Sequence, residues 1–329
     1  MVDFSLEEYE EKQGIFIQRV CDLCDMRGIT GDGTSGAKNI AISDCKDILA
    51  SYLWTHGNAI FDNGEAHSLL DLLENDKYLT DNVIMAENFR KKFEELISEP
   101  LINHPLFLLV FSLICRRTGK GIGIGEVALP LIIRDCKFSN KSDNYLNGKD
   151  KQEIGNGTGK CLKTSNDTKD FKVNYLPTDD WSSIQILKKW FNGNHLIANW
   201  PNEIEKSSYS PYEIFDGFIN EMYPISDDKF KKDLRDYLVK DENYKDPKKI
   251  ALGFGLFGLR EYKRKDDWNN IILLHEEFQE MVNITRLDDI SDISDLNLSF
   301  SPHFKKGTDS NGLSEGYIKI KMLKNKKVR

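Results

Sequence analysis

The sequence predicts an α+β protein, because helix-like and strand-like patterns occupy different parts of the chain. Apolar residues recur at helical spacing through most of residues 1–117, whereas short alternating or β-branched segments dominate from residue 266 onward. Between them lies a polar, glycine-rich stretch with turn signals typical of hairpins. A hydrophobic share of 40% in 329 residues is enough for a packed core.

These changes of pattern divide the chain into three regions. A helical N-terminal region covers residues 1–117, a core with a small mixed β-sheet, flanking helices and a helical insertion covers 118–265, and a β-rich segment covers 266–329. In the first region, helices are expected at residues 5–27, 42–54, 67–73, 81–98 and 106–117. In the second region, helices are expected at residues 182–191, 212–222, 227–239 and 247–262.

Strands are expected in two places. Residues 144–146 and 149–154 fit a hairpin that turns at Asn147-Gly148, a strong short-range hairpin signal. The C-terminal segment contains strand patterns at residues 268–275, 281–285, 296–300 and 317–322, with a short helix or turn at 286–293. These later strands either extend the sheet that contains the hairpin or form a sheet of their own.

Charge and cysteine content bear on several classes of protein. The formal net charge of −8 argues against a protein that coats nucleic acid non-specifically, although a local basic groove is compatible with it. Cys21 and Cys24 form a close pair without the second pair of a zinc site, so idle or buried thiols are expected, with metal or redox work as the alternative. The acidic first residues and the lack of a long apolar run predict a soluble, cytoplasmic protein without a membrane span.

Three carboxylates stand out around the glycine-rich centre of the chain. Glu126 follows a glycine run and opens the apolar segment 127–133, Asp143 directly precedes the expected hairpin, and Glu153 lies in its second strand. Taken singly, Glu126 fits a favourable charge in the first turn of a helix, and Asp143 fits solvated turn chemistry. Their order and spacing together predict a site for a divalent cation with oxygen ligands.

Such a site has a defined chemistry. Two carboxylates that face one another across a hairpin can bridge Mg²⁺, and Glu126 would complete or orient the ligand shell. Side chains alternate along a strand, so Lys151 is expected on the same face as Glu153. Phosphodiester hydrolysis needs a cation to activate water and to neutralise the developing charge, and a lysine near the last carboxylate positions that water.

These residues resemble the PD-(D/E)xK nuclease superfamily, in the version often found in phage genomes. Gly125-Glu126 matches its glycine-led "GE" helix, Asp143 its aspartate before a hairpin, and Glu153-Ile154 the start of its Glu-x-Lys motif. The resemblance implies a phage-encoded, Mg²⁺- or Mn²⁺-dependent DNA endonuclease in the host cytoplasm or the virion. It also implies that Asp143 and Glu153 ligate the metal and that Glu126 is an outer ligand or orients the attacking water.

The motif departs from this family at one position, because Gly155 stands where the pattern has its lysine. Lys151 in the same strand, or Lys160 or Lys163 in the next expected strand, would then supply the missing cation. The alternative is a nuclease-like protein that has lost its chemistry and serves in binding or in phage structure and assembly. That alternative leaves room for a homo-oligomer and for a phage or host protein as partner.

Four further patterns have competing interpretations. The segment from Gly123 to Ala128 fits GxGxxA, and Asp143 has the spacing of a dinucleotide fingerprint, but a polar hairpin follows where a second parallel strand belongs. Three tryptophans fit either core packing or base stacking: Trp181, Trp190 and Trp200. Three glycines indicate close helix packing or a partner interface: Gly253, Gly255 and Gly258. The basic C-terminus fits a solvated end or a phosphate contact: Lys319, Lys321, Lys324, Lys326, Lys327 and Arg329.

Overall fold

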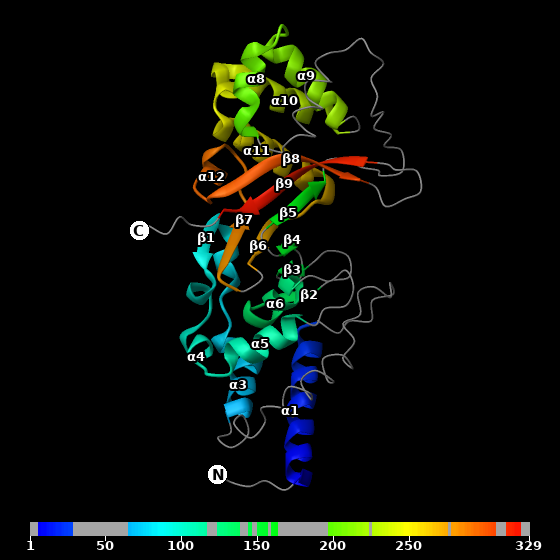
Figure 1. Cartoon of the computed structure of the whole chain (residues 1–329). Helices are drawn as coiled ribbons and strands as arrows, with labels where there is room; N and C mark the ends of the chain where they lie inside the picture. Colours follow the sequence, from blue (N-terminus) through cyan, green and yellow to red (C-terminus); the bar gives the residue numbers. More distant parts are fainter. Residues whose placement is uncertain are drawn as a thin grey trace. The chain divides into compact units, whose positions relative to one another are not determined.

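The computed structural model describes residues 6–28, 65–116, 124–138, 144–146, 150–156, 159–163, 197–223, 226–275, 278–306 and 314–323. The described residues have the predicted α+β architecture, with helices and two β-sheets (Figure 1). The chain divides into two compact units, each built from two stretches of sequence. Unit 1 comprises Met1–Gly157 and Trp268–Thr285, and unit 2 comprises Thr158–Asp267 and Arg286–Arg329.

Unit 1 is organised around a mixed sheet in the order β1-β7-β6-β4-β3-β2. Its strands are β1 (Phe89–Lys92), β2 (Cys136–Phe138), β3 (Asn144–Leu146), β4 (Asp150–Asn156), β6 (Asn270–Leu274) and β7 (Glu280–Ile284). β4 and β6 run parallel, and the other neighbouring strands are antiparallel. All five residues of β6 are buried, as expected for a continuous apolar run in the interior of a sheet.

Helices cover this sheet and build the core of unit 1. Those in the described residues are α1 (Leu6–Met26), α3 (Glu65–Glu74), α4 (Glu99–Ile102), α5 (Phe107–Arg116) and α6 (Ile124–Ile132), with the 3-10 turns η1 (Asp76–Tyr78), η2 (Asn82–Ala86) and η3 (Phe93–Leu96). An aromatic cluster lies at the centre, with ring centroids between 4.9 and 5.7 Å apart: Phe93, Phe107, Phe111 and Phe278. Burial of these rings contributes to the apolar stabilisation of the unit.

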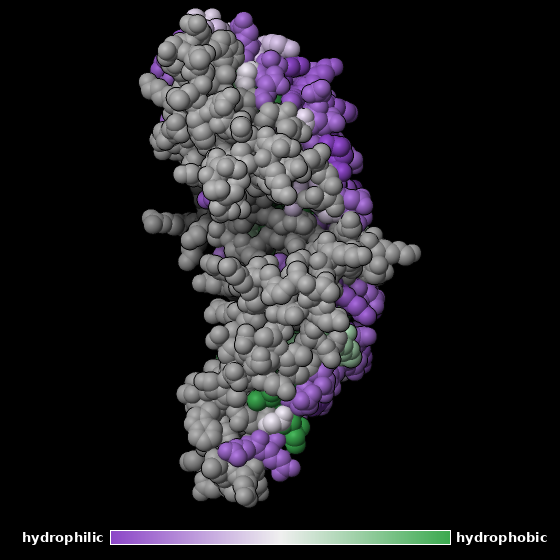
Figure 2. Space-filling model, turned by 90° about the vertical axis from the view of Figure 1, so that its right-hand side faces the viewer, coloured by the Kyte–Doolittle hydropathy of each residue, from purple (hydrophilic) through white to green (hydrophobic). Residues whose placement is uncertain are grey.

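Unit 2 has helices packed on an antiparallel sheet in the order β5-β9-β8. The strands are β5 (Gly159–Lys163), β8 (Leu298–Lys306) and β9 (Ser314–Met322); the helices and turns are η4 (Ile197–Asn199), α8 (Trp200–Lys206), α9 (Pro211–Met222), α10 (Asp228–Val239), η5 (Lys240–Lys245), α11 (Pro247–Asp266) and α12 (Ser291–Ser294). Where described residues reach the surface at the helical end of unit 2, Figure 2 shows them mostly hydrophilic, as amphipathic helices require.

The glycines of α11 allow this helix to lie close to its neighbours. A Cβ at Gly253 would lie 2.6 Å from the ring of Tyr237 on α10, and a Cβ at Gly255 would lie 2.5 Å from the ring of Phe300 on β8. A Cβ at Gly258 would overlap Ile318 on β9. The prediction of close helix packing is therefore confirmed, and the partners belong to the same unit of the same chain.

Most predicted elements agree with the structure. The helices expected at residues 5–27, 67–73, 106–117, 212–222, 227–239 and 247–262 are α1, α3, α5, α9, α10 and α11. The hairpin is β3 and β4, and the four C-terminal strands are β6, β7, β8 and β9. Both expectations for these strands hold, because β6 and β7 extend the hairpin sheet and β8 and β9 join β5. The helices expected at 42–54 and 182–191 lie outside the described residues.

The helix predicted at residues 81–98 is wrong. This segment contains η2, strand β1 and η3 instead, with β1 paired to β7. The amide of Asn283 on β7 donates to the carbonyl oxygens of Met85 at 3.1 Å and Glu87 at 2.7 Å, which holds the segment at the edge of the sheet. Contacts from residues far along the chain therefore override a local helical pattern.

The length and hydropathy of a helix decide whether it can span a membrane. Among the helices that the structure describes, none is both long and apolar enough to cross a bilayer.

Candidate metal site

Helix α6 carries Glu126 in its first turn. The apolar segment that follows, residues 127–133, is buried throughout, so the sequence of α6 makes it a core helix of unit 1. Glu126 itself is only 6% exposed, which is unusual for a carboxylate. The helix contacts strands β2 and β4, so Glu126 belongs to an element that lies against the strand of Glu153.

The hairpin that follows α6 has the expected register. Asn144 lies opposite Gln152, Tyr145 opposite Lys151, and Leu146 opposite Asp150. Asp143 directly precedes β3 in the sequence and lies outside the described residues. In an antiparallel pair, residue numbers rise along one strand as they fall along the other. The described pairing of β3 with β4 ends at Asn144 and Gln152, and Glu153 is the next residue of β4.

Strand β4 carries Lys151, Glu153 and Gly155 and lies inside the sheet between β3 and β6. Glu153 pairs with Ile271 of β6, and Gly155 pairs with Leu273. A polar sequence in the interior of a sheet contrasts with the fully buried apolar run of β6 beside it.

The two later lysines belong to another part of the molecule. Lys160 and Lys163 lie on β5, which pairs with β9 in unit 2, whereas Lys151 lies on β4 in unit 1. The described residues therefore place Glu126, Lys151 and Glu153 in unit 1, and Lys160 and Lys163 in unit 2. The chain passes from unit 1 to unit 2 after Gly157 and returns at Trp268. The first boundary lies within the expected region 118–265, and the second lies just beyond its end.

The described part of the chain shows no ready-made metal centre. It contains no group of three or more histidine, cysteine, aspartate or glutamate side chains arranged to hold an ion. Cys24, Cys115 and Cys136 are buried, as expected of thiols that pack in a core. The described context also differs from a dinucleotide site, because helix α5 precedes α6 and the antiparallel strands β2 and β3 follow it.

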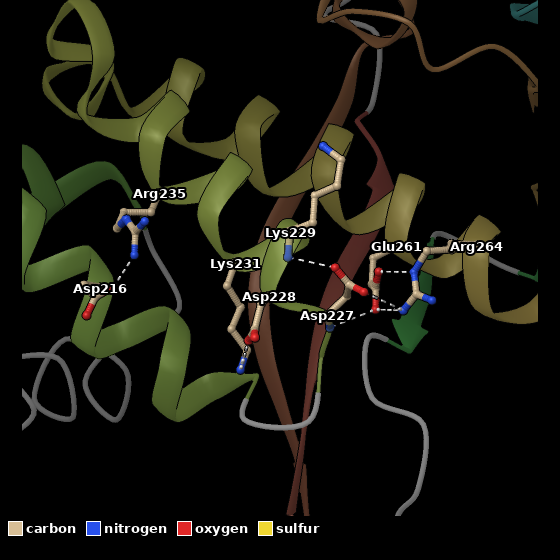
Figure 3. A network of polar contacts seen from close by, with 8 residues as sticks. All are labelled: Asp216, Asp227, Asp228, Lys229, Lys231, Arg235, Glu261 and Arg264. Atoms are coloured by element: carbon tan, nitrogen blue, oxygen red, sulfur yellow. Dashed lines mark hydrogen bonds and ion pairs between the residues drawn. The ribbon is translucent and has the colours of Figure 1, made fainter.

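A network of charged residues in unit 2 has a structural role (Figure 3). Asp227 caps α10 by accepting a hydrogen bond from the backbone N–H of Lys229 at 2.7 Å. The buried carboxylate of Glu261 accepts from the backbone N–H of Asp227 at 3.4 Å and from the guanidinium of Arg264 at 2.9 Å. The hydrogen bond to Glu261 raises the pKa of Arg264. Arg235 pairs with Asp216 and so links α10 to α9. These carboxylates serve helix capping and helix packing.

Two buried side-chain amides in unit 1 were not predicted from the sequence. Asn270 on β6 donates to the side-chain oxygen of Asn283 on β7 at 3.0 Å and to the carbonyl oxygen of Met85 at 2.7 Å. Asn283 is fully buried and donates to two backbone carbonyls in turn. An asparagine inside an apolar strand is the signal that points to such a pair, because a buried amide needs hydrogen-bond partners. They bond to each other and to backbone carbonyls, so their role is structural.

Comparison with known proteins gives no further assignment. No family model, no curated protein and no solved structure matches this chain.

Proposed function

We propose that this protein is a metal-dependent nuclease whose site lies at the β3–β4 hairpin and the start of α6. The observation that carries the proposal is the contact of α6 with β4, in a unit where β4 also pairs with the strand that Asp143 precedes. Asn144 pairs with Gln152; Asp143 directly precedes Asn144 in the sequence, and Glu153 directly follows Gln152. Two carboxylates from the hairpin and a third from the helix would then meet at one place.

The chemistry of this donor set fits Mg²⁺ or Mn²⁺. Carboxylate oxygens are the ligands that these hard cations prefer, and neither a thiol nor an imidazole belongs to the set. Asp143 and Glu153 would hold the ion, and Glu126 would be an outer ligand or would orient water. When bound, the cation would supply Lewis-acid stabilisation of the phosphate charge and lower the pKa of a bound water.

Lys151 is the best candidate for the lysine that Gly155 replaces. It lies two residues before Glu153 in β4, and residues two apart in a strand belong to the same face. An ammonium group there would hold the attacking water and balance negative charge as the phosphodiester bond breaks. Lys160 and Lys163 are weaker candidates, because β5 belongs to unit 2. DNA is the substrate that the family resemblance favours.

Cleavage of supercoiled plasmid and of single-stranded DNA with Mg²⁺ or Mn²⁺ tests this proposal. We expect metal-dependent cutting by the wild type and at least a roughly 100-fold loss in Asp143→Ala and Glu153→Gln, since each removes a metal ligand. Lys151→Met should lose activity as well, whereas Lys91→Met, at an exposed position of strand β1, is a matched control that should cut normally. Full activity in Asp143→Ala or Glu153→Gln would overturn the assignment.

A second candidate function rests on Gly155. The pairing of Gly155 with Leu273 puts a residue without a side chain at the position where the family motif has its lysine. A nuclease-like protein that binds a partner or assembles in a phage particle would have no need of that lysine. No cutting by the wild type on either DNA, together with capture of a specific phage or host protein, would favour this function over hydrolysis.

A further inference from the structure

We draw no further inference here: the strongest candidate, the side-chain cluster in which Arg19 of α1 hydrogen-bonds to His67, Asp71 and Glu74 of α3, holds these two helices together, and nothing among the described residues points to a metal ion, ligand or partner that it would bind.

Discussion

Replacement of Gly255 by alanine tests the close packing of α11 on the sheet of unit 2. The new Cβ would lie 2.5 Å from Cγ and Cδ2 of Phe300, a ring that is 2% exposed. This is about 1 Å short of ordinary van der Waals contact, and the crowded atoms belong to the base of a buried ring that cannot swing away. Helix α11 or strand β8 must therefore shift.

The expected size of the effect comes from two opposing terms. Overpacking a well-packed core costs about 1–3 kcal/mol, and replacing a helical glycine by alanine gains about 0.5–1 kcal/mol. The central values of these ranges, about 2 and about 0.75 kcal/mol, give a net destabilisation of unit 2 by about 1 kcal/mol in Gly255→Ala. Gly14→Ala in α1 is the matched control, because no neighbouring atom lies within 4 Å of its new Cβ, and it should stabilise unit 1 by up to about 1 kcal/mol.

Native-state hydrogen exchange read by mass spectrometry is the suitable assay, because peptides from α11 and from α1 report on their own units. Opening free energies should fall in α11 of Gly255→Ala and rise in α1 of Gly14→Ala. Adding Phe300→Leu should recover part of the loss, with a coupling energy above about 0.5 kcal/mol. Stabilisation of α11 by Gly255→Ala would refute the argument, since it would show that helix propensity outweighs the contact with Phe300.

Two further changes probe capping and buried polar groups. Asn283→Ala should lower the unfolding free energy of unit 1 by about 2–3 kcal/mol in urea, because buried backbone carbonyls and Asn270 lose their partner. The exposed Asn202→Ala should cost less than about 0.5 kcal/mol, and equal losses would contradict this. Ser210→Ala removes a capping box from α9 and should cost about 1 kcal/mol in thermal unfolding. Hydrogen bonds from the Ser210 side chain and backbone lower the pKa of Glu213 from its ordinary 4.5, so this stabilisation is present above the unfolded-state pKa and disappears as pH falls through the folded-state pKa. Ser210→Ala should thus lose less stability than the wild type on acidification, and an identical acid profile would speak against these bonds.

Local signals explain why the hairpin could be predicted from sequence. Asn147-Gly148 is a turn signal in the sequence, and the short segments on both sides of it form the antiparallel strands β3 and β4. The capping pattern from Ser210 to Glu213 and the proline at the start of α9 likewise define the beginning of a helix within four residues. Such features need no information from distant parts of the chain.

Distant contacts explain what could not be predicted. Strand β1 forms because β7 pairs with it and because Asn283 holds the carbonyls of Met85 and Glu87. Neither interaction has a trace in residues 81–98 themselves. The return of Trp268–Thr285 to unit 1 is equally hidden, and so is the assignment of Lys160 and Lys163 to a different unit from the strand of Glu153. For the candidate site, the sequence therefore predicts the order of carboxylates, while the assignment of lysines depends on topology.

Binding of Mn²⁺, followed by electron paramagnetic resonance, tests the proposed metal site most directly, because it needs no knowledge of the nucleic-acid substrate. The account predicts that the wild type binds Mn²⁺ in competition with Mg²⁺ and that Glu153→Gln weakens this binding at least about tenfold. The variant Glu95→Gln, an exposed carboxylate of unit 1, should bind like the wild type. Equal affinity for Mn²⁺ in the wild type and in Glu153→Gln would contradict the metal site at the β3–β4 hairpin.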